Sequence, residues 1–150
     1  MLKSLVLPLA GGVLLTLLAL NLAACTNKTS DRDLVYVSAE EGQRLAAGER
    51  SLLGKVTAAT WVDARSKADY DAGHIPGAIS LPFENVTADY SIIKDKQIVM
   101  VYGGDYNDAR AKSMVKRLWQ LLPHHDIRFF DGGVRAWKAA GNELEVTKAP

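Results

Sequence analysis

The stretch from Trp61 to Pro82 constrains the fold of this chain more than any other part of its 150 residues. A short apolar segment is followed there by a charged spacer and by the glycine-proline turn Gly73–Ala78. Ser66 is placed to cap a helix over 67–72, because its hydroxyl oxygen can accept a hydrogen bond from the first helical turn. Gly73 is placed to end that helix in a left-handed conformation. The stretch therefore predicts a strand, a short helix, a rigid turn and a second strand in succession.

The rest of the chain also alternates strands and helices. Ile98–Tyr102 is a continuous apolar run, which is typical of a strand covered on both faces in a parallel sheet. The segment 107–122 has an apolar face and a basic face, as expected for a helix that packs on such a sheet. Further strands are expected at 34–37, 61–62, 78–81 and 127–130, and further helices at 39–47 and 134–140. We therefore predict one α/β domain, with a central, mainly parallel five-stranded sheet and helices on both faces.

The first 24 residues have the features of a secretory signal. A single cation, Lys3, precedes an apolar run from Leu5 to Leu22 that ends in small residues. Leu22-Ala23-Ala24-Cys25 resembles a bacterial lipobox, in which cleavage before Cys25 leaves its sulfur to take up a diacylglycerol. Two or three acyl chains, such as palmitate, would anchor the domain stably. An ordinary signal with an incidental cysteine, or a retained membrane helix, is the alternative interpretation.

The sequence after the signal divides into a tether and a domain. We expect residues 1–24 to be the signal peptide, 25–33 the acylated cysteine and a flexible polar tether, and 34–146 the domain. Thr26 resembles the residue that accompanies outer-membrane sorting, so the expected location is the bacterial cell envelope, on the outer membrane and facing the periplasm. Without the signal the chain has as many basic as acidic residues, 17 of each. This balance gives no reason to expect a nucleic acid partner.

Two motifs in the domain resemble those of the rhodanese-like family. Asp63-Ala64-Arg65, with Tyr70 shortly after it and then the turn Gly73–Ala78, resembles the front half of that domain. Phe130–Trp137, with Gly141 after it, resembles its close. The resemblance covers residues 34–144 and implies the rhodanese fold. It also implies that the active site is the loop after the central strand, where catalytic members carry a cysteine that holds sulfur as a persulfide.

Gly103 occupies the position of that cysteine. A thiolate is both the nucleophile and the sulfur carrier of this chemistry, and glycine has no side chain. Cys25 is the only cysteine in the sequence, and it lies outside the domain. We therefore assign no catalytic residue and expect neither sulfur transfer nor the related phosphatase and arsenate reductase reactions.

The remainder of the loop also departs from the family pattern. Its residues form a degenerate active-site loop: Gly103, Gly104, Asp105, Tyr106, Asn107, Asp108 and Arg110. Asp108 stands where a family loop often carries a cation, and Arg110 comes two residues later. The carboxylates disfavour a thiolate, so a Gly103→Cys variant is expected to regain little or no sulfurtransferase activity. We expect Asp105 or Asn107 to cap the helix that follows.

The other polar residues of the motifs are expected to be structural. Asp63 and Arg65 are predicted to form a pair that fixes their loop. His74 could act as a base, but a hydrogen bond that orients the loop is the favoured interpretation. Neither the pair His124-His125 nor the loop provides a complete ligand set for zinc or calcium, so no metal or other cofactor is expected.

Three functional classes are compatible with these sequence features. The favoured one is a non-catalytic, membrane-anchored binding module for an envelope protein or a small ligand. Its loop would offer backbone N–H groups and the aromatic ring of Tyr106. The second is a sulfur-handling enzyme component that relies on a partner's cysteine, and the third is a structural appendage of an envelope complex.

Overall fold

The structure, a computed structural model, describes residues 30–50 and 56–147. The predicted signal, Cys25 and the first tether residues lie outside the described residues, as does the segment 51–55 that we expect to be a loop. Within the described part, no helix has the length and apolar character needed to cross a bilayer.

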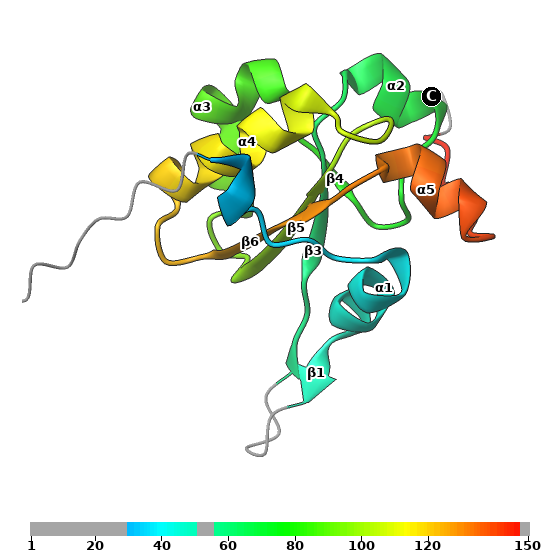
Figure 1. Ribbon diagram of the computed structural model, residues 1–150, viewed down its shortest axis with the longest axis horizontal. Helices are drawn as coiled ribbons and strands as arrows, with labels where there is room; N and C mark the ends of the chain where they lie inside the picture. Colours follow the sequence, from blue (N-terminus) through cyan, green and yellow to red (C-terminus); the bar gives the residue numbers. More distant parts are fainter. Residues whose placement is uncertain (1–29, 51–55, 148–150) are drawn as a thin grey trace, which may run out of the picture.

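A parallel sheet of four strands forms the centre of the domain (Figure 1). Its spatial order is β4-β3-β5-β6, with the bounds β3 (Thr60–Asp63), β4 (Ile79–Ser80), β5 (Ile98–Tyr102) and β6 (Asp126–Phe130). Val62 of β3 pairs with Val101 on one side and with Ile79 on the other. Because all four strands are parallel, their carboxyl ends meet at one edge, where ligand sites of open α/β sheets lie. Two short strands, β1 (Glu49–Arg50) and β2 (Val56–Thr57), form a separate antiparallel pair.

The expected fifth strand is reduced to a single bridge. Tyr36 bridges Phe129 of β6 in the parallel sense. The contact has two hydrogen bonds, from the Val37 N–H to the Phe129 carbonyl (3.0 Å) and from the Phe129 N–H to the Val35 carbonyl (2.8 Å). Ser38 then caps helix α1 (Ala39–Ala47), so the chain turns away before a ladder can form.

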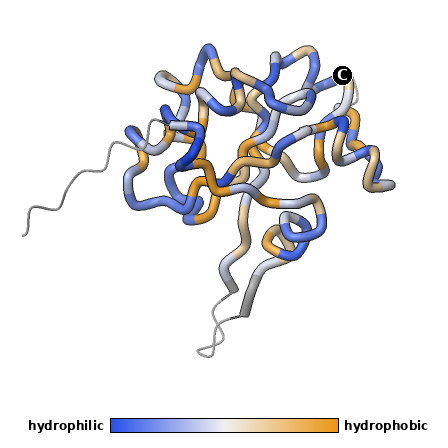
Figure 2. Tube along the Cα trace, viewed as in Figure 1, coloured by the Kyte–Doolittle hydropathy of each residue, from blue (hydrophilic) through white to orange (hydrophobic). Residues whose placement is uncertain are grey.

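The two faces of the sheet are covered by different helices (Figure 1). Val99 and Val101 of β5 point into a core beneath α4 (Ala109–Leu121), α3 (Val86–Asp89) and the flanking turns η2 (Phe83–Asn85) and η3 (Tyr90–Ile93). Met100 and Tyr102 point into the other core, which is closed by α1, α2 (Lys67–Ala72) and α5 (Gly133–Ala139). Figure 2 shows the apolar strands enclosed by more polar helices. The prediction of a parallel α/β fold with helices on both faces is confirmed.

Helix α2 begins as predicted but ends differently. The Ser66 hydroxyl oxygen accepts a hydrogen bond from the Asp69 N–H (3.1 Å). Gly73 ends the helix at φ 159° and ψ 125°, which is extended and not left-handed, so that expectation is wrong. The chain stays extended because the next residue, His74, pairs with Glu145, while Leu144 packs against Gly73.

The end of the expected tether is also structured. Residues Asp31–Asp33 form a turn of 3-10 helix, η1, capped by Ser30. The Asp31 carboxylate pairs with Lys116 (2.5 Å) and with Lys112 (3.2 Å) of α4. These ion pairs hold the turn, which lies within the expected tether, against α4.

Candidate functional site

The degenerate loop lies at the carboxyl-terminal edge of the sheet, between β5 and α4. Tyr102 and Gly103 are buried, whereas Asp105, Tyr106 and Asn107 are exposed. The first turn of helix α5 binds the loop through backbone hydrogen bonds. The Val134 N–H donates to the Gly103 carbonyl (3.1 Å), and the Arg135 N–H donates to the Gly104 carbonyl (3.2 Å).

The space beside Gly103 is filled by the side chain of Asp108. A Cβ added to Gly103 would lie 2.8 Å from the Asp108 Cβ and closer still to the carboxylate. Real Cβ contacts essentially never fall below 3.0 Å. As long as Asp108 keeps its place, the loop therefore has no room for a side chain at position 103.

Asp108 binds backbone N–H groups on both sides of the loop. Its Oδ1 accepts from the Arg110 N–H (3.0 Å) and the Ala111 N–H (3.1 Å), and its Oδ2 accepts from the Gly104 N–H (3.0 Å). Asp108 is thus the N-cap of α4, and the expectation that Asp105 or Asn107 would fill this role is wrong. A carboxylate at this end of a helix also interacts favourably with the helix dipole.

Two other carboxylates bind N–H groups at the loop tip. Asp105 accepts from the Tyr106 N–H (2.7 Å), and Asp131 accepts from the Asn107 N–H (2.7 Å). The Tyr106 bond, followed by the ion pair with Arg135, lowers the pKa of Asp105. The hypothesis that the loop offers free N–H groups to a ligand is therefore wrong for Gly104, Tyr106 and Asn107.

Asp131 also fixes the loop, a role that we did not anticipate from the sequence. It follows β6 and also accepts a hydrogen bond from the Gly132 N–H (3.0 Å). Its place directly after a strand that borders β5 was a usable signal, because the carboxyl ends of neighbouring parallel strands share one edge.

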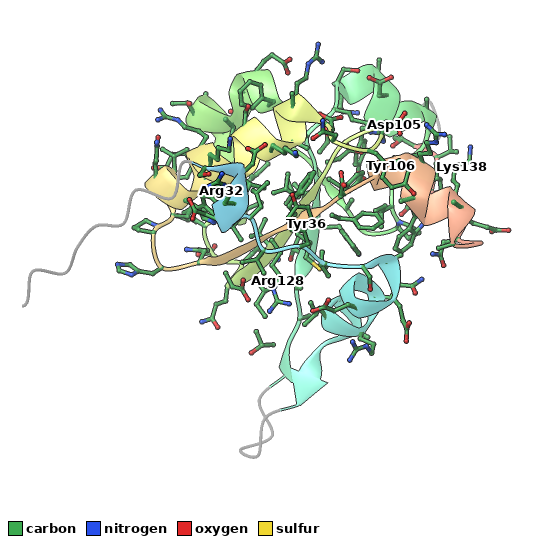
Figure 3. All side chains as sticks on the ribbon, in the orientation of Figure 1. Arg32, Tyr36, Asp105, Tyr106, Arg128 and Lys138 are labelled. Carbon is green, nitrogen blue, oxygen red and sulfur yellow. The ribbon has the colours of Figure 1, made fainter. Side chains whose placement is uncertain are left out.

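Tyr106 is the main exposed aromatic residue of the loop. Its side chain has a relative exposure of 56%. One edge of the ring rests on Gly132, where an added Cβ would lie 2.6 Å from Tyr106 Cε1. The Arg135 guanidinium lies 5.8 Å from the ring centroid and pairs with Asp105 at 3.1 Å. Figure 3 shows Asp105 and Tyr106 close together beside α5.

Asp63 and Arg65 form the pair that the motif led us to expect. Asp63 is fully buried, and Arg65 binds it at 2.6 Å through Nη2, which also donates to the Gly73 carbonyl (2.7 Å). The Tyr102 hydroxyl hydrogen-bonds to Asp63 and accepts from the Ile75 N–H (3.1 Å). Burial, and then the Asp63 charge, raise the pKa of Tyr102 well above its ordinary value. This network joins the first motif to the strand that leads into the loop.

His74 lies in the turn and is not part of the loop. Its imidazole is buried and stacks on the Tyr70 ring, with centroids 3.7 Å apart. Nδ1 lies 2.9 Å from the Tyr70 carbonyl oxygen, and Nε2 lies 3.6 Å from a Glu145 carboxylate oxygen. His74 is thus placed to orient the turn.

A cavity of about 480 Å³ opens beside the loop. Arg65, Asp69, Asp108 and Arg110 contribute charged groups to its wall, together with Ala64, Gly104 and Ala109. Arg110 is exposed and lies 3.7 Å from Glu84. Carboxylates therefore balance the cations of the cavity. Among the described residues, no three histidine, aspartate or glutamate side chains come together as a metal site.

Comparisons with known proteins identify the family. A profile of the Rhodanese-like domain family matches residues 50–140, which is more than half of the chain. The chain therefore belongs to the rhodanese-like family. Its sheet and helices also match the solution structure of the rhodanese-like domain of an Anabaena protein, with a TM-score of 0.58 and 28% identity over 77% of this chain and 83% of that one. A rhodanese-related protein from Thermoplasma volcanium shares the fold with a TM-score of 0.59 and 21% identity, over 76% of this chain and 99% of that one.

Two curated relatives are named as sulfurtransferases. A Saccharopolyspora erythraea protein with the provisional name thiosulfate sulfurtransferase is 33% identical over 92 residues, which is 50% of this chain and 32% of that protein. The adenylyltransferase and sulfurtransferase MOCS3 of Drosophila virilis is 25% identical over 120 residues, 75% of this chain and 26% of that protein. The chain thus spans a third or less of the length of these relatives.

Proposed function

We propose that this protein is a non-catalytic rhodanese-like binding module, anchored in the bacterial cell envelope through an acylated Cys25. The proposal joins two independent lines of reasoning. The loop residues argue against sulfur transfer, and the N-terminal sequence argues for a lipid anchor.

The contact between Gly103 and Asp108 carries the first part of the proposal. Sulfur transfer needs a thiolate at the end of the central strand, and here a carboxylate fills the space that a side chain would need. The 150-residue sequence has one cysteine, Cys25, and the proposed acylation would consume its sulfur. The similarity to proteins named as sulfurtransferases supports a common fold and ancestry. We do not assign their activity to this chain.

The exposed side chains around the loop support a role in binding a protein. Tyrosine and arginine are enriched among the residues that dominate interface energies. Tyr106 and Arg135 are both exposed and are held by Gly132 and Asp105 before any partner arrives. Such preorganisation reduces the entropy lost on binding.

The alternative is a sulfur-handling role that uses a partner's cysteine. The cavity beside the loop, with Arg65 and Arg110 in its wall, is the observation that favours it. A thiosulfate–cyanide assay on the Thr26–Pro150 chain tests for activity without a partner. We expect no turnover above the uncatalysed rate, and sustained turnover would overturn the non-catalytic proposal.

Photo-crosslinking in native membranes tests the binding role. A photoreactive residue in place of Tyr106 is expected to capture one envelope protein. The matched control is the same residue in place of Tyr36, which has a similar exposure of 52% but lies beside β6 (Figure 3). Capture of the same proteins from both positions would contradict a specific site at the loop.

A further inference from the structure

The contact between η1 and α4 places the loop close to the point where the tether leaves the domain. Lys112 donates to Asp31 Oδ2 at 3.2 Å and also hydrogen-bonds to Asn107 Oδ1 of the loop. Lys116 pairs with the same Asp31 carboxylate at 2.5 Å. We call this set of contacts the Asp31 clasp. A carboxylate of the tether and an amide of the loop therefore share one ammonium group.

The clasp is built from well-held groups. The Lys112 side chain is only 13% exposed and that of Lys116 is 28% exposed, so neither extends freely into solvent. Their hydrogen bonds, first from Lys116 and then from Lys112, lower the pKa of Asp31. On the far side of the loop, the Asn107 N–H is bound by Asp131. The clasp thus connects the tether to the loop through direct contacts.

The short tether determines which face of the domain lies near the lipid. Asp31 is six positions after Cys25, which limits the distance between the two residues to about 20 Å even for a fully extended chain. A domain of this size has a diameter of about 35 Å. Because the tether is much shorter than the domain is wide, the face that carries the clasp cannot turn far from the membrane. Helix α1 and strand β1 lie at the opposite end of the molecule from α3 and α4 (Figure 1).

We infer that the Asp31 clasp holds the degenerate loop on the membrane-facing side of the anchored domain, where its partner is a protein of the same membrane. The inference rests on the lipid anchor of the proposed function. The N–H groups of Gly104, Tyr106 and Asn107 are already bound by carboxylates, so they are not free to bind a phosphate headgroup. The exposed Tyr106 beside Arg135 suits a protein surface.

Fluorescence transfer to labelled lipid headgroups tests the orientation. An acylated Cys25 has no free thiol, so one introduced cysteine takes the dye selectively. We compare the full-length lipoprotein, reconstituted in vesicles, with the dye at Ser113→Cys on α4 or at Ala47→Cys at the end of α1; both positions are exposed. Transfer from position 113 is expected to be at least twofold more efficient. Equal transfer from the two positions would overturn the inference.

Two variants test separately how the clasp and the length of the tether contribute to the orientation. Asp31→Asn is expected to reduce the ratio between the two dye positions, whereas the charge-matched control Asp89→Asn on α3 is expected to leave it unchanged. Forty flexible residues inserted after Thr29 span about 35 Å and are expected to bring the ratio close to one. A ratio that withstands both changes would show that neither the clasp nor the tether sets the orientation.

The remaining outcomes distinguish this inference from the proposed function. Labelling cells with palmitate reports whether Cys25 is acylated; a chain without label would overturn the anchor and this inference with it. A labelled chain with equal transfer from both positions would overturn the orientation alone.

A photoreactive residue at position 106 is expected to capture a membrane protein. The inserted linker should lower the crosslinking yield several-fold, because it reduces the effective concentration of the loop near its partner. Capture of lipid alone would overturn the assignment of a protein partner.

Discussion

The turn Gly73–Ala78 contacts Tyr102 and the loop Gly103–Asp108 follows it in the chain, yet the two segments are held in different ways. The turn is fixed by distant parts of the chain: His74 exchanges two backbone hydrogen bonds with Glu145, and the Ile75 N–H donates to Tyr102. The loop is fixed largely by carboxylates at its own ends and in the next loop. The comparison shows that two neighbouring segments of one site are positioned differently, the turn by backbone pairing with a distant segment and the loop by side-chain carboxylates.

The largest expected effect concerns the ion pair that supports the turn. Asp63→Ala should lower the free energy of unfolding by about 3 kcal/mol or more, because it leaves the Arg65 guanidinium without its buried partner. Urea unfolding monitored by circular dichroism measures the change, with the exposed Asp95→Ala as control. A loss below about 1 kcal/mol would mean that the pair is not the support of this region.

The next effect concerns the room beside Gly103. Gly103→Cys should lower the free energy of unfolding by about 2 kcal/mol, because the new Cβ overlaps Asp108. The double variant Gly103→Cys, Asp108→Ser should recover at least half of this loss, since serine is smaller and still caps a helix. A double-mutant cycle measures the coupling. Additive effects would contradict the steric conflict, and rapid persulfide formation in the single variant would contradict the closed loop.

A smaller loss of stability is expected at Gly132, against which the ring of Tyr106 rests. Gly132 has φ +81°, and a methyl group there would also press on the tyrosine ring. Gly132→Ala should cost about 1–2 kcal/mol of unfolding free energy for the left-handed conformation alone. It should also displace the ring, as seen in its aromatic NMR signals. Gly77 has a positive φ of 73° but open space around an added Cβ, so Gly77→Ala measures the backbone strain without the contact.

The smallest effect is the acid titration of Asp105. Its pKa is held below the ordinary 3.8, first by the Tyr106 N–H and then by Arg135. The stabilisation is therefore present above the unfolded-state pKa and is lost as the pH falls through the lower folded-state value. Titration by carbon NMR should show a lowered pKa that Arg135→Ala raises only in part. A full return to 3.8 in that variant would assign the shift to the ion pair.

The sequence predicted the fold from its local patterns. Ile98–Tyr102 is apolar throughout because both faces of β5 are covered, and Ser66 caps α2 because the geometry involves only neighbouring residues. The prediction for Gly73 failed where a distant residue intervened. Gly73 stays extended because the chain pairs with Glu145. The expected strand at 34–37 is cut short for a local reason, because Ser38 caps α1 and the chain turns away there.

The loop shows the same division between local and distant information. Composition alone established that no cysteine follows β5. It led us to expect Asp105 or Asn107 as the cap of α4, although Asp108 is an equally suitable type of cap residue. Asp108 has the additional advantage that it accepts a third hydrogen bond, from the Gly104 N–H across the loop.

The sequence by itself determined the order of the elements, the family motifs and the lack of a thiol in the domain, because each of these depends on residue identity or on short-range periodicity. Only the tertiary structure decided that Asp108 fills the space beside Gly103, that Asp131 binds the loop from β6, and that Asp31 joins the tether to α4. These contacts join residues whose side chains meet only after the strands have paired and the helices have packed, so no local pattern could specify them.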